Sequence, residues 1–320
     1  MLIEENKNIG STLLNSVEAQ SSVYNAFFGF SRSPFSSQNN SDCVFKYSSA
    51  RNVINTILFC IKTGESACLI NGQQGVGKSL LISKAIDLLS DEFYVVQLGN
   101  SARLNSRDIL MHIIDELGLS YHPELSQCQL RKLVKSSLFA HYSRTDVSIV
   151  LWFDDAHLLS DCALAEIKAL SEIGTKRKLL LQFIFSGQFA DSNAWACPAG
   201  QQLLKNINFS EELKSLSFSE TKAFVLSRLR AVGGSNKKMM SFFALLYLHK
   251  KSQGNPKIIS RVLHKSLLLG YGKGIKKINF SFLRSAIKES EILLNQNKNV
   301  RFYPAVMFAL GFYVCFLLLG

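Results

Sequence analysis

The sequence has no paired cysteine motif, and its first residues do not look like a signal peptide. Its seven cysteines are odd in number and include no C-x-x-C spacing. They indicate buried free thiols in a reducing compartment, with neither a disulfide framework nor a zinc site. The first ten residues, MLIEENKNIG, are polar, and no apolar segment of a signal peptide follows them. No internal repeat occurs at solenoid periods, which excludes repeat architectures.

Acidic residues are scarce in the carboxy-terminal third of the chain. Residues 222–301 carry 17 lysines or arginines against two acids, Glu289 and Glu291, while the whole chain has a net charge of +12. A solvated basic helical surface would explain this excess. The sharper alternatives are contact with an anionic membrane or with a nucleic acid.

One stretch lacks charge altogether. Residues 302–319, FYPAVMFALGFYVCFLLL, have no charged side chain over 18 residues. As a helix they would span about 27 Å, close to the roughly 30 Å of a bilayer's hydrocarbon core. Lys298 and Arg301 precede the stretch, so the positive-inside rule places everything upstream in the cytoplasm. We expect a single-pass membrane anchor; a buried helix or a re-entrant segment is the alternative.

Apolar runs alternate with amphipathic segments in the first two thirds of the chain. We predict strands at residues 66–70, 93–98, 147–153 and 179–186, and helices at 49–63, 79–90, 106–117, 126–142 and 161–173. Ser48 or Ser49 is expected to cap the first helix, and Gly64 to end it. Nearly continuous apolar strands between helices predict an α/β fold with a parallel sheet covered on both faces.

No convincing strand is predicted beyond about residue 211. Helical patterns at 219–232, 238–252, 256–270 and 280–294 indicate a small bundle. Gly233 can end its first helix, and Asn255 followed by Pro256 is typical of a helix start. The predicted domains are an amino-terminal segment (1–47), an α/β core (48–210), a basic helical domain (211–295), a basic linker (296–301) and the anchor (302–319).

A complete phosphate-loop pattern lies between the first predicted strand and the next helix. Residues 72–79, GQQGVGKS, fit G-x-x-x-x-G-K-[ST]. Glycines let the backbone turn its N–H groups inward as an anion cradle, and the helix adds its positive end. Lys78 is predicted to reach the β- and γ-phosphates of ATP, and the Ser79 hydroxyl to bind Mg²⁺. The expected nucleotide contacts are Gly72, Gln73, Gln74, Gly75, Val76, Gly77, Lys78, Ser79 and Leu80.

Two acids follow the third predicted strand. Asp154 is expected to hold Mg²⁺ at the carboxyl edge of the sheet, and Asp155 to polarise the attacking water. A helix cap is the alternative for either acid. At the end of the next strand, Ser186 or Gln188 could sense the γ-phosphate, or be a turn residue. His157 is expected to be a structural or a surface residue.

Several motifs occur together in an order that resembles one family, the AAA+ ATPases of the general secretion pathway protein A family, with related pilus-assembly ATPases. They are YNAFFGFSRSPF (24–35), the phosphate loop, the acid pair with AH after it, ALAEIKALSEI, KLLLQFIFSGQ and GNPKIISRVLH. The resemblance covers about residues 22–295. It implies an ATPase core, a helical lid, a nucleotide-dependent homo-oligomeric ring and a bacterial inner-membrane location. It also implies a role in assembling a type II secretion or pilus complex with an inner-membrane partner.

The sequence departs from this family at three positions that bear on catalysis. Asp155 stands where the family has Glu, which withdraws the carboxylate by on the order of 1 Å, and such a shift can lower the rate about 10²-fold. The segment 198–209 aligns where the family offers arginines, and its only cation is Lys205. Lys257, expected at the nucleotide, replaces an arginine and supplies charge without a bidentate fork. If the chain stops after its anchor, we expect the family's periplasmic wall-binding domain to be missing from it.

These features leave three functional hypotheses. The first is a membrane-anchored ATPase that turns over slowly or with a partner. The second is a nucleotide-gated scaffold that binds ATP with little hydrolysis. The third, a nucleic-acid-binding AAA+ protein, is disfavoured, because anionic lipid next to the anchor would explain the basic lid.

Overall fold

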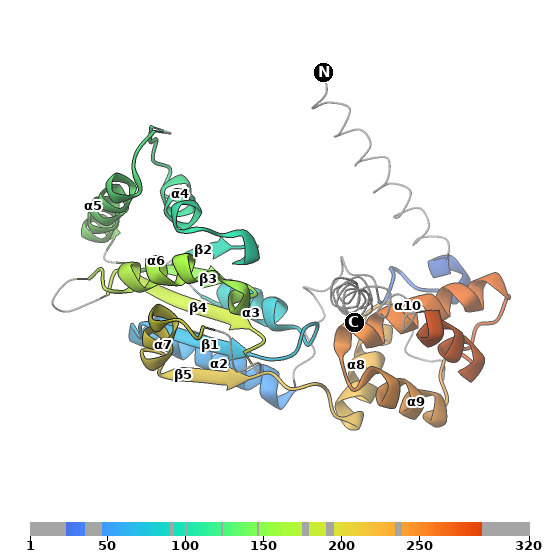
Figure 1. The fold of residues 1–320 in the computed structure, drawn as a ribbon. Coiled ribbons are helices and arrows are strands. Elements are labelled where there is room, and N and C mark those ends of the chain that lie inside the picture. Colours follow the sequence, from blue (N-terminus) through green and yellow to red (C-terminus); the bar gives the residue numbers. More distant parts are fainter. Residues whose placement is uncertain are drawn as a thin grey trace, which may run out of the picture. The chain divides into compact units, whose positions relative to one another are not determined.

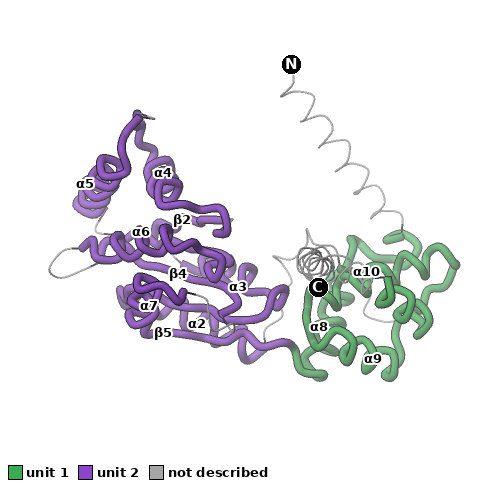
Figure 2. The backbone as a smooth tube through the Cα atoms, viewed as in Figure 1, with its two compact units in different colours: residues 1–39, 216–320 green, residues 40–215 purple. Residues whose placement is uncertain are grey.

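The computed structural model describes residues 24–35, 47–89, 93–99, 101–122, 124–145, 147–174, 179–189, 195–233 and 239–289. The chain divides into two units (Figure 2). Residues 40–215 form the first, here called the core unit, and residues 1–39 with 216–320 form the second, here called the helical unit. The predicted linker at 296–301 and anchor at 302–319 lie outside the described residues.

The core unit is built on one parallel sheet with the strand order β2-β3-β4-β1-β5 (Figure 1). The strands are β1 Ala67–Asn71, β2 Tyr94–Leu98, β3 Ile149–Phe153, β4 Leu181–Gly187 and β5 Phe209–Glu212. The first four and the α/β class are as predicted. The fifth corrects the prediction that strands end before residue 211. Its sequence, FSEE, is half-buried and has no apolar run, so its pairing with β1 had no local signal.

Helices cover both faces of this sheet. Four helices share one apolar core with inward residues of β1 to β4, such as Leu151 and Phe183. They are α4 Ser106–Glu116, α5 Gln127–Thr145, α6 Asp161–Ser171 and α7 Pro198–Lys205. The alternate residues belong to the other face, where α2 Ser48–Thr63 and α3 Lys78–Asp87 pack together. The helices of this unit fall near their predicted ranges, except α7, which was not predicted.

The ends of α2 show one correct and one wrong prediction. The helix ends at Gly64, whose φ of 76° is left-handed, as expected. Its N-cap position is Tyr47, with no side-chain capping hydrogen bond to the helix, so neither Ser48 nor Ser49 caps it. At its carboxyl end the buried Gln182 amide donates to the carbonyls of Cys60 and Ile61. The same carbonyls accept from the backbone N–H groups of Glu65 and Gly64, so the sheet residue adds a second hydrogen bond that ties the helix end to β4.

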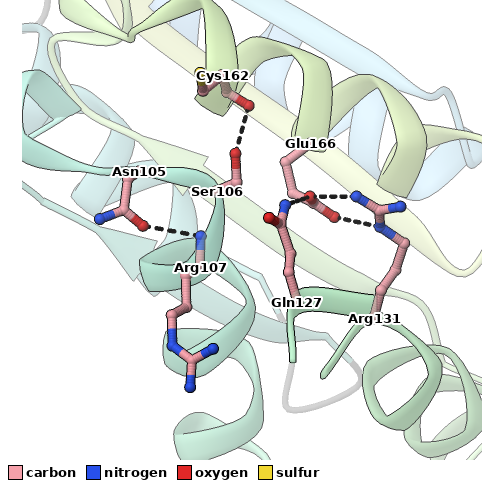
Figure 3. A network of polar contacts seen from close by, with 7 residues as sticks. All are labelled: Asn105, Ser106, Arg107, Gln127, Arg131, Cys162 and Glu166. Carbon is pink, nitrogen blue, oxygen red and sulfur yellow. Dashed lines mark hydrogen bonds and ion pairs between the residues drawn. The ribbon is translucent and has the colours of Figure 1, made fainter. Parts of the chain in front are cut away.

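A buried carboxylate joins α5 to α6 (Figure 3). Glu166, 1 % exposed, accepts from Arg131 at Nε–Oε1 2.7 Å and Nη2–Oε2 2.6 Å, and from Gln127 at Nε2–Oε2 2.7 Å. The bidentate hydrogen bond to Glu166 raises the pKa of Arg131. Nearby, the Ser106 hydroxyl of α4 donates to the Cys162 carbonyl of α6 at 2.7 Å. These contacts fix the layer of helices α4, α5 and α6.

The helical unit contains α8 Phe218–Arg230, α9 Phe242–Ser252 and α10 Pro256–Gly272, with residues 280–289 also helical. The Asn255 side chain accepts from the backbone N–H groups of Lys257 and Ile258, and Pro256 is the first helical residue, as predicted. α8 ends at Arg230, and Gly233 lies beyond it in the following turn with a φ of 85°. None of the helices described in either unit is long and apolar enough to cross a membrane.

The aromatic segment at residues 24–35 packs within the helical unit. Tyr24 is fully buried, and its hydroxyl hydrogen bonds to Ser33 and to Nδ1 of His264 in α10 at 3.1 Å. Burial lowers the pKa of His264. The Ser31 N–H donates to the Val232 carbonyl at 3.0 Å. These residues, which the sequence assigned to a separate amino-terminal segment, are therefore part of the core of the helical unit.

Candidate nucleotide-binding site

The glycines of the phosphate loop serve different physical purposes. Gly75 and Gly77 have φ values of 85° and 108°, which side chains strongly disfavour. Gly72 is needed for close approach, because a Cβ there would lie 2.7 Å from the Leu213 carbonyl oxygen. Its N–H donates to the Gly187 carbonyl at 3.1 Å, which ties the loop to the end of β4. The loop therefore has the sharp, closely packed path that the motif predicts.

Lys78 is the first residue of α3 and is only 7 % exposed. Its ammonium donates to the carbonyls of Gly72 at 2.7 Å and Gln73 at 3.1 Å. Burial lowers its pKa, and the nearby carboxylates of Asp155 and Asp154 act in the opposite direction. The ammonium has three N–H groups, and these two carbonyls accept from two of them. The third N–H can therefore donate to an anionic oxygen such as that of a phosphate, which would also compensate the buried charge.

Asp154 is the centre of the polar contacts at the end of β3. Ser79 donates to its Oδ2 at 2.6 Å, and Ser186 donates to its Oδ1 at 2.7 Å. The Asp155 N–H donates to Oδ1 at 3.1 Å. The Ser79 hydroxyl and the Asp154 carboxylate, 75 residues apart in sequence, thus meet at one point. Hard oxygen donors of this kind suit Mg²⁺.

Asp155 has the backbone of a strained turn. Its φ of 51° and ψ of 38° are left-handed, and it precedes the short 3₁₀ helix η2 Ala156–Leu158 without a side-chain cap to it. Asp155 thus occupies the N-cap position of η2, but its side chain makes no capping hydrogen bond. Aspartate adopts this conformation more readily than most residues. The turn leaves the carboxylate half-buried next to the phosphate loop's lysine, whose pKa it influences.

The end of β4 supports the site through buried contacts. Ser186 is fully buried and accepts from the Trp152 indole N–H at 3.2 Å while donating to Asp154. The Gln188 N–H donates to Nδ1 of His157 at 3.2 Å. Ser186 thus reaches the site by orienting Asp154, and His157 has the structural contact expected of it. A γ-phosphate role for Ser186 or Gln188 stays a prediction.

Sequence reasoning missed two residues at this edge. The Asn71 side chain at the end of β1 accepts from the Phe189 N–H at 3.0 Å. The Ser101 hydroxyl hydrogen bonds to the Asp154 carbonyl. An asparagine directly before a phosphate loop is a signal that could have been noticed. No sequence signal marks Ser101, because its hydrogen-bond partner is 53 residues away.

Two predicted residues lie at other places in the structure. Lys257 is exposed at the start of α10 in the helical unit, and its role at the nucleotide stays a prediction. Lys205 is exposed in the last turn of α7, a helix whose sequence, PAGQQLLK, contains no arginine.

The fold and this site are similar to those of AAA proteins with a phosphate loop. Residues 61–190 match the AAA domain family. The fold resembles Cdc6p from Pyrobaculum aerophilum, with a TM-score of 0.65 and 16 % identity, covering 80 % of this chain and 70 % of that one. It also resembles the Drosophila ORC bound to DNA, with a TM-score of 0.58 and 15 % identity, covering 75 % and 60 %.

The chain is related to general secretion pathway protein A of Aeromonas hydrophila. The two sequences are 28 % identical over 256 residues, which is 80 % of this chain and 46 % of the relative. The chain thus spans about half the length of the curated relative it matches. The resemblance predicted from the motifs is confirmed.

The described residues fit a nucleoside triphosphate with Mg²⁺. The N–H groups of the loop and the Lys78 ammonium would hold phosphate oxygens, and Ser79 with Asp154 would hold the metal. A bound Mg²⁺ would neutralise charge on the phosphates. Asp155 can accept a proton from water, or orient it, with its half-buried carboxylate.

Proposed function

We propose that this chain is an ATPase that binds Mg²⁺ and ATP at the phosphate loop and hydrolyses the nucleotide. The convergence of Ser79 and Asp154, 2.6 Å apart from two different elements, is the observation that carries the proposal. Ser186 fixes the same carboxylate from a third element, so the oxygen donors are held before any ligand arrives.

We further propose that the ATPase is anchored in the bacterial inner membrane by residues 302–319 and works in assembling a type II secretion complex as a nucleotide-dependent homo-oligomer. Two observations support this. The segment has 18 residues without a charge, and the curated relative carries the name general secretion pathway protein A. An inner-membrane partner would complete such an assembly.

A nucleotide-gated scaffold is the second candidate. Asp155 is one methylene shorter than the glutamate that the resemblance leads us to expect, and its backbone is already committed to a tight turn. The α7 helix supplies no arginine to a neighbouring subunit, and such an arginine can be worth about 10³–10⁵ in rate. Both observations favour binding with slow turnover.

ATP binding and turnover by the full chain in detergent or lipid test these alternatives. We expect Lys78→Ala to lose binding, and Asp155→Asn to bind Mg²⁺–ATP but not hydrolyse it. If the wild-type protein hydrolyses above the Lys78→Ala background, the ATPase proposal stands. If it binds tightly but its turnover does not exceed the Lys78→Ala background, the scaffold replaces the ATPase. Omitting Mg²⁺ should weaken binding in wild type, since Ser79 and Asp154 would lose their cation.

Alkaline carbonate extraction tests the anchor separately. We expect the full chain to stay with the membrane and a variant lacking residues 302–320 to be released. Release of both would overturn the anchor without affecting the ATPase proposal.

A further inference from the structure

The helical unit has a basic surface with few acids. Its described residues include two acids, Glu220 and Glu289. Its exposed bases are Lys222, Arg230, Lys250, Lys251, Lys257, Arg261, Lys273, Lys276, Lys277, Arg284 and Lys288. Such a surface attracts an anionic partner and repels a cationic one.

An apolar cluster interrupts this basic surface where α8 and α9 begin. Phe242, Phe243 and Leu246 are 58 %, 76 % and 42 % exposed. Phe218 joins them from α8, with its ring 5.5 Å from that of Phe242, and Phe242 and Phe243 are 5.8 Å apart. We call these four residues the aromatic patch. Neighbouring exposed apolar side chains of this kind mark an interaction surface more often than isolated ones do.

The three residues that α9 contributes to the patch lie on the outer face of that helix, away from the core. The inner face of α9 is formed by Ala244, Leu245 and Leu248, all buried. Phe242 and Leu246 are one turn apart on the opposite side, and Lys250 follows one turn later. Lys222 likewise follows Phe218 by one turn on α8. Apolar side chains at one end and lysines one turn further on suit a boundary between hydrocarbon and anionic head groups.

Ring geometry argues against stacked bases as the occupant. The planes of Phe218 and Phe242 cross at 80°, and those of Phe242 and Phe243 at 81°. Successive bases need aromatic faces on which to stack, and these edge-on rings offer no shared face. Leu246 adds aliphatic surface, which has no stacking role and inserts readily among acyl chains.

We propose that the aromatic patch, with Lys222 and Lys250, docks the helical unit onto an anionic lipid surface. The proposal rests on the anchor proposed above, because only 12 residues separate position 289, the last described, from the apolar run at 302. A chain of that length reaches roughly 45 Å at most. The bilayer would therefore stay within reach of the unit, at a high effective concentration.

Quenching of tryptophan fluorescence by brominated lipid tests this contact in the full chain. The two native tryptophans, Trp152 and Trp195, are each 3 % exposed in the core unit, so they give a low background. A Phe243→Trp variant puts a reporter in the patch, and Leu268→Trp, at a 40 % exposed position of α10, is the matched control. Vesicles carry bromine in the acyl chains of either phosphatidylglycerol or phosphatidylcholine.

We expect several-fold stronger quenching of Phe243→Trp than of Leu268→Trp on phosphatidylglycerol, and little quenching of either on phosphatidylcholine. Adding Lys222→Gln and Lys250→Gln should remove most of the quenching, since each lysine is worth about fivefold in affinity for an anionic surface. Equal quenching at both positions, or none, would overturn the proposal. So would binding of a single-stranded oligonucleotide that Phe243→Ser abolishes while lipid quenching is absent.

Carbonate extraction of the same variants separates this result from the anchor. A chain that resists extraction without preferential quenching at position 243 keeps the anchor and overturns the docking surface. A chain that is extracted but still shows quenching on phosphatidylglycerol keeps the docking surface and overturns the anchor.

Discussion

At the scale of single residues, Asp155 combines a short side chain with a left-handed backbone. If its carboxylate is too far from the attacking water, Asp155→Glu should raise kcat by up to about 10²-fold, because a 1 Å shift can matter that much. Asp155→Asn should abolish turnover and leave ATP affinity unchanged. Steady-state ATPase assays and equilibrium binding on the same samples measure both. Hydrolysis by Asp155→Asn at the wild-type rate would remove Asp155 from the mechanism.

Lys78 is a second residue at which the effect of a substitution on nucleotide binding can be measured separately from its effect on stability. Its pKa is lowered by burial, so the ammonium is less favourable in the folded chain than in the unfolded one. We expect Lys78→Met to keep the nucleotide-free protein as stable as wild type within about 1 kcal/mol, since an apolar side chain of similar length replaces a desolvated charge. Wild type should gain roughly 2.7 kcal/mol from ligand at 100 times Kd, and the variant nothing. Denaturant unfolding with and without Mg²⁺–ATP measures this.

The lowered pKa of Lys78 also determines whether this residue makes the fold more or less stable as the pH rises. Between the lowered pKa of Lys78 and its ordinary value of 10.5, the unfolded chain binds more protons than the folded one at this site. This group's contribution to stability therefore rises with pH through that window. The rise should be missing in Lys78→Met, and an identical slope in both proteins would contradict the assignment.

At the scale of elements, the pairing of α5 with α6 depends on Glu166. Arg131→Ala leaves a carboxylate that is 1 % exposed with Gln127 as its remaining side-chain partner among the described residues. We expect a loss on the order of 2 kcal/mol, less than the roughly 3–5 kcal/mol of a fully buried pair, because Arg131 is 44 % exposed and water can reach the site. Urea unfolding checks this. Arg131→Met with Glu166→Leu, which removes both charges, should lose less than Arg131→Ala; a larger loss would show that packing dominates.

Prediction at this scale succeeded where the signal was local. The four apolar strands and the cap at Asn255 followed from contiguous patterns. The strand β5 and the cap of α2 did not, because β5 depends on pairing with β1 and the N-cap position of α2 is Tyr47, with no side-chain capping hydrogen bond. Both are fixed by tertiary packing, which no short window of sequence contains.

At the scale of the whole molecule, the helical unit includes residues from both sides of the core unit in sequence. Tyr24 is fully buried against His264, 240 residues away. Tyr24→Ala should lower the stability of the helical unit by about 3–5 kcal/mol through the cavity it leaves. Hydrogen exchange should become faster in α8 and α10 and stay unchanged in β1, β3 and β4. Nucleotide binding by the core unit should persist.

Tyr24→Phe is the matched control, since it keeps the ring and removes only the hydroxyl hydrogen bonds to Ser33 and His264. Its effect should be near 1 kcal/mol. Faster exchange throughout the core unit in Tyr24→Ala would contradict the division into two units.

The phosphate loop, the acid pair, the α/β class and the similarity to general secretion pathway protein A could all be predicted from the amino-acid sequence, because each is encoded in contiguous residues or in their order. The folded structure was needed to show that Ser79 and Ser186 hold the two oxygens of Asp154, that β5 extends the sheet, and that residues 24–35 belong with α10. Each depends on residue pairs that are 32 to 240 positions apart in the sequence. Contacts over such distances are set by packing of the whole chain, which local propensity does not encode.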